Sequence, residues 1–342
     1  MRSHARTIVV LALAVGLVAL FFRNVDLGQV VAGILRARPE WLALSLATTF
    51  VNLAIRALRW QYLLRPLGTT TFANVFRATA VGFAATSLLP ARAGEVIRPY
   101  FLARHEQMSA TGAFATIILE RLLDTITVLV LLASYVFVFG RDVAFTNPAG
   151  FKAVKWAGAS AAVIAFAALV VLFLLAKDPA RLGRTIERLA QMVPSALAAL
   201  LARVAEKFAR GLVAIRQPVR LLSALAWSFP LWLSICLGIW SVTVAFRFAI
   251  PFTGSFLLLA LLVLGVTVPT PGAIGGFHEA FRIGATVFFG APNSAAVGAA
   301  IVLWFFSVGP SLFLGLVFAA QVGLNLNGIR RLSHQAEQGH TV

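Results

Sequence analysis

The chain contains several apolar stretches, each about as long as a helix that crosses a lipid bilayer. They cover residues 7–22, 41–58, 112–139, 155–176, 221–246, 253–269 and 295–323. A crossing helix needs roughly 17 to 25 mainly apolar residues, so each stretch predicts a membrane span. Hydrophobic residues make up 60% of the 342 residues and charged residues only 12%, whereas soluble domains are roughly 25% charged. We therefore expect an all-α fold, a polytopic membrane helix bundle.

The basic residues lie mainly between these apolar stretches. The formal net charge is +17, but no single basic patch is evident, so positive-inside topology explains the charge better than nucleic-acid binding does. Residues 177–220 hold nine Lys/Arg and three acidic residues, with apolar residues at three- and four-residue spacing, which predicts a cytoplasmic amphipathic linker. Arg2, Arg6, Arg330 and Arg331 predict that both termini are cytoplasmic as well.

Two interrupted regions decide the number of spans. Residues 73–108 are expected to begin and end on the cytoplasmic side and break at Pro90 and Gly94, which predicts a re-entrant hairpin. Residues 270–292 form a short, glycine-rich segment. We expect this segment to cross the membrane as a broken helix, because the crossing places both termini on the cytoplasmic side. The prediction is a single domain, residues 1–342, with about eight spans, divided into 1–176, the linker 177–220 and 221–330.

The two interrupted regions resemble each other. Each begins with Pro-x-x-x-Gly, at Pro90 and at Pro271, and each then reaches a glutamate followed by an arginine. Paired interruptions in the two halves of a chain indicate a transporter-type site built from an internal repeat; a chance match between ordinary Pro and Gly interruptions is the alternative. The helix-breaking residues expected to border a cavity are Pro90, Gly94, Pro269, Pro271, Gly272, Gly275 and Gly276.

Charged residues lie in or beside the apolar segments, where an ionised side chain needs a partner. One group surrounds Gly94 and a second lies inside the stretch 112–139. One hypothesis is that the arginines bind an anionic headgroup through their forked donors, while carboxylates orient them or exchange protons. The alternative is a set of ion pairs that fasten the re-entrant segment to its neighbour. The predicted substrate-binding residues are Arg92, Glu95, Arg98, Glu120, Arg121, Asp124 and Glu279.

Other polar residues receive structural interpretations. Arg56, Arg59 and Trp60 are typical of an anchor at the membrane interface, which Asn52 could extend inward; a role in substrate binding is the alternative. His278 is expected to bond to backbone rather than to relay protons. The five histidines form no cluster with metal-ligand spacing, so we predict no metal site, no cofactor and no catalytic residue. The absence of a phosphate-binding loop indicates transport driven by a gradient, or passive movement.

Three motifs in order carry a resemblance to a known family. Pro-Ala-Arg-Ala-Gly-Glu-Val-Ile-Arg (90–98), Glu-Arg-Leu-Leu-Asp (120–124) and Pro-Thr-Pro-Gly-Ala-Ile-Gly-Gly (269–276) resemble the lysylphosphatidylglycerol synthase transmembrane-region family, also called the flippase-like domain family. The resemblance spans residues 8 to 325 and implies a multi-pass cytoplasmic-membrane protein of bacteria or archaea that handles a charged or polyprenyl lipid. The soluble transferase domain of the synthases is expected to be absent. Ala273 stands where the family usually has a second glycine.

Motifs and resemblance together predict a lipid translocase. An anionic headgroup would enter a polar cavity bounded by 88–99, 116–124 and 269–282, while the acyl tails remain in the bilayer. We expect membrane lipids as partners, no nucleic acid, and a transporter rather than an enzyme. Two alternatives stay open, a membrane-embedded transferase acting on lipid-linked substrates and a noncatalytic partner in envelope assembly. The sequence leaves homo-oligomerisation open.

Overall fold

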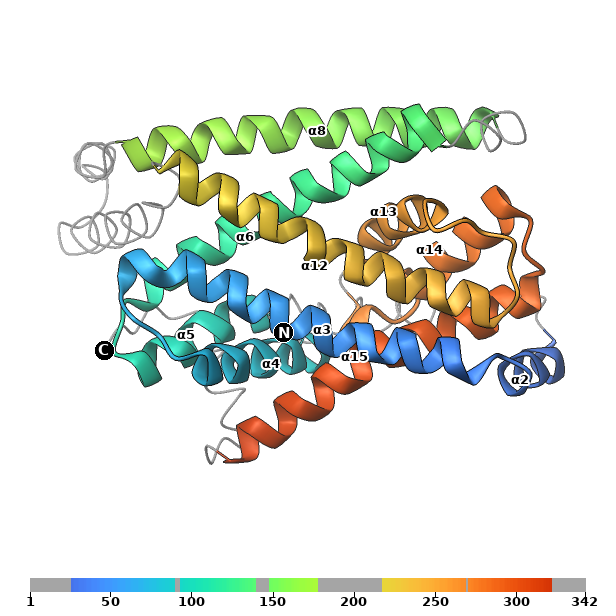
Figure 1. The fold of residues 1–342 in the computed structure, drawn as a ribbon, viewed down its shortest axis with the longest axis horizontal. Coiled ribbons are helices and arrows are strands. Elements are labelled where there is room, and N and C mark those ends of the chain that lie inside the picture. Colours follow the sequence, from blue (N-terminus) through green and yellow to red (C-terminus); the bar gives the residue numbers. More distant parts are fainter. Residues whose placement is uncertain (1–25, 90–92, 140–147, 178–216, 269, 322–342) are drawn as a thin grey trace, which may run out of the picture.

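The computed structural model describes residues 26–89, 93–139, 148–177, 217–268 and 270–321. Within these ranges every regular element is a helix, and Figure 1 shows the helices packed into one bundle. The expected all-α membrane fold is confirmed, since four described helices are long and apolar enough to cross a membrane: Pro39–Leu67, Ala110–Phe139, Val219–Ala245 and Asn293–Gln321. The stretch 7–22, nearly all of the linker and the Arg330–Arg331 pair lie outside the described residues.

The long helices form the frame of the bundle. They are α3 (Pro39–Leu64), α6 (Ala110–Ser134), α8 (Pro148–Lys177), α12 (Pro218–Ala245) and α15 (Asn293–Gln321). Helices α3 and α12 pack antiparallel. The start of α3 lies beside the end of α12, where the Arg38 N–H donates to the Ala245 carbonyl (3.1 Å). The short helix α2 (Leu27–Leu35) packs across α15. The bundle has two ends: the α5 end lies on the left-hand side of Figure 1, and the α2 end lies on the right-hand side.

Helices α4 (Phe72–Leu88) and α5 (Gly94–Glu106) form an antiparallel pair, here called hairpin A. At its open ends, Glu106 Oε1 accepts hydrogen bonds from the backbone N–H of Thr71 (3.0 Å) and from Asn74 Nδ2 (2.9 Å). Near its tip, a Cβ on Gly94 would lie 1.9 Å from the carbonyl oxygen of Gly82, so only glycine permits this approach. Residues 73–108, predicted to be re-entrant, lie in this hairpin, and both of its arms end at the α5 end.

A second antiparallel pair, hairpin B, consists of α13 (Gly254–Val266) and α14 (Gly276–Ile283), the latter extended by a π-helical turn to Phe288. A Cβ on Gly254 would lie 3.0 Å from the ring of Phe289, so the two open ends are neighbours. The structure pairs α13 with the segment that follows it in one hairpin, an arrangement that the sequence did not predict. That 270–292 crosses the membrane as a broken helix stays a prediction. The glycine-rich turn between α13 and α14 reverses the chain at mid-bundle.

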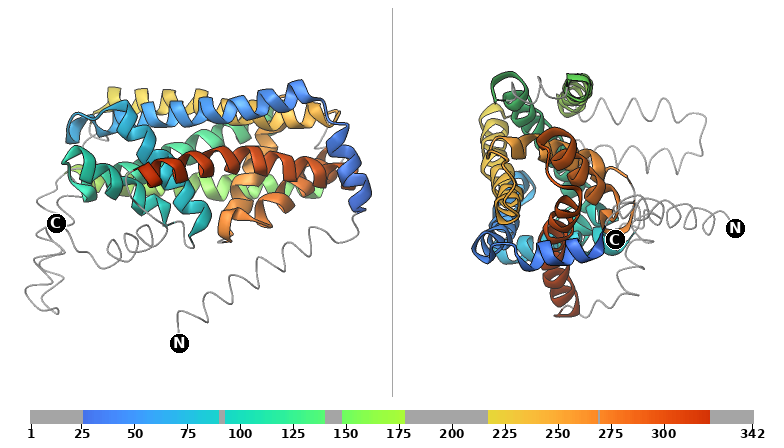
Figure 2. Two further views of the ribbon diagram at one scale, coloured as in Figure 1. Left: turned by 90° about the horizontal axis from the view of Figure 1, so that it is seen from below. Right: turned by 90° about the vertical axis from the view of Figure 1, so that its right-hand side faces the viewer.

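The two hairpins enter from opposite ends and meet tip to tip, as Figures 1 and 2 show. A Cβ on Gly272, in the turn of hairpin B, would lie 3.7 Å from the carbonyl oxygen of Ser87 near the tip of hairpin A. Trp304 of α15 fixes the same turn, because its Nε1 donates to the Gly272 carbonyl (2.7 Å). Opposed hairpins that carry similar motifs are the arrangement expected of an inverted repeat.

Substituting Gly265 tests the close packing of hairpin B. A Cβ there would lie 2.3 Å from the Gly276 carbonyl oxygen and 2.7 Å from the Ala280 Cβ, so Gly265→Ala is expected to destabilise the protein by about 2 kcal/mol through overpacking. Thermal unfolding in detergent, followed by tryptophan fluorescence, measures the change. Gly309→Ala is the matched control, since its nearest neighbour would be 3.9 Å away. Equal melting temperatures for the two variants would contradict the packing.

Candidate functional site

A cavity of about 600 Å³ lies among the hairpin tips and the long helices. Helices α3, α6, α12 and α15 and both hairpins contribute to its wall. Its charged lining residues are Arg56, Glu95, Arg121 and Asp124. The three segments predicted to bound a cavity all reach this one, with Leu89 and Glu95 from the first, Arg121 and Asp124 from the second, and Thr270, Gly272, Ala273 and Phe277 from the third.

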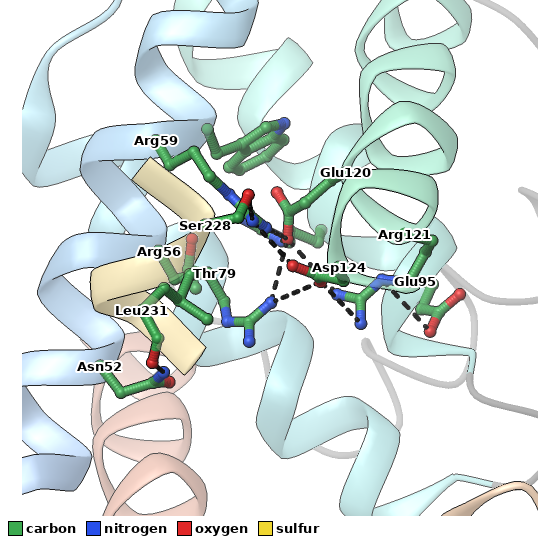
Figure 3. A network of polar contacts seen from close by, with 12 residues as sticks. Asn52, Arg56, Arg59, Thr79, Glu95, Glu120, Arg121, Asp124, Ser228 and Leu231 are labelled. Carbon is green, nitrogen blue, oxygen red and sulfur yellow. Dashed lines mark hydrogen bonds and ion pairs between the residues drawn. The ribbon is translucent and has the colours of Figure 1, made fainter. Parts of the chain in front are cut away.

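Asp124 is the hub of the charged wall. Its Oδ1 accepts hydrogen bonds from Arg59 Nη1 (2.7 Å) and from Trp232 Nε1 (2.9 Å), and its Oδ2 accepts one from Arg56 Nη1 (3.2 Å). Figure 3 shows α3 and α6 facing each other across these contacts. The side chain is 5% exposed. A buried carboxylate paired with two arginines holds them in fixed positions.

Glu120 forms a second layer behind the cavity wall. It is fully buried, and its Oε1 accepts hydrogen bonds from Arg98 Nη1 (3.0 Å) and Arg56 Nη1 (3.3 Å), with Arg59 Nη2 at 3.4 Å. The guanidinium of Arg98 also lies 3.9 Å from the ring centre of Trp60, a close cation–π contact. Arg98 and Glu120 do not line the cavity, so they hold the site together rather than contact its contents.

Arg121 and Glu95 form the more accessible edge of the cavity. Their side chains are 34% and 31% exposed, and Arg121 Nε lies 3.9 Å from Glu95 Oε1, an ion pair too long to be a hydrogen bond. Arg121 also contacts both buried carboxylates: its Nη2 donates to Glu120 Oε1 (3.4 Å), and its Nη1 lies 3.7 Å from Asp124 Oδ2. All of these contacts are long, which leaves the guanidinium able to turn toward an incoming anion.

The cluster holds more positive than negative charge. Four arginines, at positions 56, 59, 98 and 121, meet three carboxylates, at 95, 120 and 124. Several buried guanidinium nitrogens have no hydrogen-bond partner among the described residues: Nε of Arg56, Arg59, Arg98 and Arg121, and Nη2 of Arg59 and Arg98. Glu120 Oε2 likewise has no hydrogen-bond partner in the described part of the chain. Only Arg56 and Arg121 bring their spare Nε donors to residues that line the cavity, beside Glu95 and Asp124. Such donors at low dielectric suit an anion.

The structure brings together five of the seven predicted binding residues: Glu95, Arg98, Glu120, Arg121 and Asp124. Glu279 lies apart and does not line the cavity; it pairs with Arg282, whose Nη1 donates to Asn293 Oδ1 (2.9 Å). Arg92, Pro90 and Pro269 fall outside the described residues.

The interpretation of Arg56, Arg59 and Trp60 as an interface anchor is wrong. Their exposed fractions are 4%, 0% and 0%, and both arginines pair with the carboxylates of α6. The physical reason is that α3 faces α6 in mid-bundle, where these charges neutralise each other. The argument applied to the carboxylates, that charges inside an apolar run need partners, would have identified these arginines too.

The turn of hairpin B contains residues with positive φ. Gly272 has φ 61° and Gly275 φ 89°, values that glycine adopts freely. Ala273, at the position where the related family usually has glycine, has φ 56°, which costs a residue with a Cβ about 1 kcal/mol. Gly272 and Ala273 line the cavity, so the turn presents backbone rather than bulky side chains to it.

Comparison with known proteins places the chain in a family. A family model described as the lysylphosphatidylglycerol synthase TM region matches residues 7–315. The chain belongs to this family. A UPF0104 membrane protein of Methanocaldococcus jannaschii is 27% identical over 104 residues, 30% of this chain and 31% of the relative. A second UPF0104 membrane protein, of Methanothermobacter thermautotrophicus, is 31% identical over 101 residues, 29% of this chain and 30% of the relative.

These local matches cover under a third of either relative's length. The family match, in contrast, includes both hairpins and the arginine cavity, which span residues 45 to 311. The cavity is therefore part of the lysylphosphatidylglycerol synthase TM region of this chain, and it is formed by that region's own helices.

Removing the charge of Glu120 tests the buried network. Glu120→Gln keeps the side-chain shape but leaves Arg98, Arg59 and Arg56 short of one negative charge in a buried site, so we expect a loss of about 3 kcal/mol of unfolding free energy. Denaturant titration in mixed micelles measures it. The control Glu40→Gln changes an exposed glutamate in the first turn of α3 and should cost about 0.5 kcal/mol. If the two variants have the same free energy of unfolding, the buried network does not stabilise the fold.

Proposed function

We propose that this membrane protein moves lipids between leaflets by taking an anionic headgroup into the arginine cavity. The observation that carries the proposal is that Arg56 and Arg121 line a cavity enclosed by two opposed hairpins, in a cluster with excess positive charge. A phosphate group fits spare guanidinium donors well, because Arg presents them in a planar fork. Family membership is consistent with the proposal, since the family is described by the membrane region of a lysylphosphatidylglycerol synthase.

Exposed residues of the cavity lining support a lipid rather than a soluble anion. Thr125 of α6, Thr267 after α13 and Ser307 of α15 line the cavity and are themselves exposed. Leu264 and Phe305, at 53% and 62% exposure, lie within one helical turn of Thr267 and Ser307. A headgroup could enter from the side while its tails stay among the apolar side chains.

The paired state of Asp124 favours transport over group transfer. Each of its oxygens accepts a hydrogen bond from an arginine, and one also accepts from Trp232. A general base must lie within hydrogen-bonding distance of the proton that it takes from a substrate, whereas this carboxylate already accepts hydrogen bonds from two arginines and a tryptophan. The carboxylate acts here as a holder of arginines, and this role suits a site that binds and releases an unchanged molecule.

The charge pattern supports an orientation in the membrane. With the basic linker in the cytoplasm, the α5 end of the bundle and both termini face inward, and hairpin B enters from outside. Each hairpin tip would then separate the cavity from one side of the membrane, and a headgroup at the arginines would sit between two barriers. Movement of one tip at a time would expose the site to one leaflet at a time.

Leaflet exchange in proteoliposomes tests the proposal. Phosphatidylglycerol carrying a fluorophore on its acyl chain is reconstituted with purified protein, and dithionite quenches only the outer leaflet. Wild-type protein should raise the exchange rate above that of empty vesicles, and Arg121→Gln should lower the increment about tenfold or more, because it removes a charged donor to the phosphate.

Arg77→Gln is the matched control, since Arg77 is exposed on hairpin A and does not line the cavity. It should retain the wild-type rate. Folding of each variant is checked by its melting temperature. Wild-type vesicles that exchange no anionic lipid faster than empty ones would refute the proposal.

A further inference from the structure

A second cavity, of about 520 Å³, lies between the end of α6 and the first half of α8. We call it the α6–α8 groove. Figure 1 shows these two helices meeting at the α2 end of the bundle, with α8 along its outer side. No described residue lines both the groove and the arginine cavity. The groove is therefore a separate site with its own chemistry.

Small residues of α8 leave this groove open. Gly158, Ala159 and Ala162 line it from α8, opposite leucine, valine, alanine and phenylalanine side chains of α6. Gly158 also lets the two helices approach each other, since a Cβ there would lie 3.2 Å from Leu132 Cδ2. Most of the groove therefore offers only apolar contacts, which suit a hydrocarbon chain.

The polar lining residues lie together at one end of the groove. Lys152, Lys155 and Trp156 belong to the first three turns of α8, and all three are exposed. Lys155 Nζ lies 5.4 Å from the centre of the Phe137 ring, and neither lysine forms an ion pair with a described carboxylate. Lysine and tryptophan are the residues that lie at the level of lipid headgroups. This end of the groove therefore has a positive charge where a headgroup would be.

The length of the groove matches one leaflet of a bilayer. Its lining runs from Lys152 to Ala162 on α8, about 15 Å at the rise of an α-helix, and from Leu129 to Phe137 on α6, about 12 Å. The hydrocarbon core is roughly 30 Å thick, so one leaflet contributes about 15 Å. A crossing helix of another protein would contact both leaflets, whereas an acyl chain ends near the midplane. The length therefore favours a lipid as the occupant.

We propose that the α6–α8 groove binds one anionic phospholipid that stays bound and is not transported. One acyl chain lies against the small residues of α8, and the phosphate lies between Lys152 and Lys155, which attract an anionic headgroup at the membrane surface. The lipid comes from the leaflet at the α2 end and does not cross the membrane. This site is independent of the proposed translocation.

Native mass spectrometry of the delipidated full chain in detergent counts the bound lipids. Phosphatidylglycerol should bind the groove about tenfold or more tightly than phosphatidylcholine, because each lysine near the headgroup adds attraction for a net negative charge. Lys152→Gln with Lys155→Gln should remove this preference and leave phosphatidylcholine binding unchanged. The matched control is Arg36→Gln with Arg38→Gln, which removes two exposed charges at the same end of the bundle.

Filling the groove tests the position of the acyl chain. Ala159→Phe places a ring where the chain would lie, so the variant should bind one lipid fewer than the wild type, whichever headgroup is offered. Ala162→Phe, one turn further along α8, repeats the test if the first variant fails to fold. Ala157→Phe is the control, since Ala157 is exposed on α8 and does not line the groove.

Three results would overturn the proposal. The first is equal affinity of the wild type for the two lipids, and the second is an unchanged lipid count in both groove-filling variants. The third is a wild-type dimer that dissociates in Ala159→Phe, which would show that a second copy of the chain fills the groove. Failure of leaflet exchange would refute the proposed function and would leave this lipid site standing.

Discussion

The ion network between α3 and α6 is the interaction on which the remaining structure depends. Arg56 and Arg59 are buried in α3, and Glu120 and Asp124, which lie within hydrogen-bonding distance, offset the cost of burying their charges. Arg98 joins hairpin A to the same carboxylates. One cluster therefore fixes a long helix, its neighbour and a hairpin relative to each other, and the cavity exists at the place where they meet.

The two hypotheses about the charges apply to different parts of the cluster: the buried part fastens helices, and its accessible edge is where we propose that the headgroup binds. Arg59, Arg98 and Glu120 are buried behind the wall and fasten the helices. Arg121 and Glu95 are about one-third exposed at the cavity edge. The inner layer holds the outer layer in place, so a headgroup would meet arginines that are already oriented and that need little reorganisation to bind it.

Close glycine contacts give the two hairpins a shared construction. Gly82 with Gly94 and Gly265 with Gly276 bring helix backbones together near each tip, at distances that no Cβ would allow. Such pairs let short helices pack at mid-bundle without long side chains between them. The space beside the tips then remains available for the cavity and for residues of α3, α6 and α15.

The sequence predicted the helical class, hairpin A and the residues of the α6 cluster, because apolar length, a Pro/Gly break and buried charge are local signals. Hairpin B was missed because Leu-rich α13 looks like an ordinary crossing, and only its contact with α14 through Gly265 and Gly276 shows that the chain turns back. Arg56 was misplaced because an arginine near a tryptophan is typical of an interface. Its burial depends on α6, which lies far away in the sequence.

The serine and threonine residues of α3 that line the cavity could not be predicted from the sequence either. Ser45, Thr48 and Asn52 lie on one face of α3, but serine and threonine are ordinary in membrane helices, where their hydroxyls bond to their own backbone. What gives them meaning is the open space in front of them, which depends on α12, α15 and both hairpin tips. A cavity is a property of the tertiary arrangement, and no single segment encodes it.

The most direct test of the central claim is to locate the lipid. Phosphatidylglycerol with a photoreactive group beside its phosphate is reconstituted with the protein and irradiated, and the attached peptides are mapped by mass spectrometry. The account predicts attachment within residues 45–56 of α3 and 121–128 of α6, reduced by unlabelled phosphatidylglycerol. Attachment confined to the outer faces of the bundle, such as α8, would contradict it.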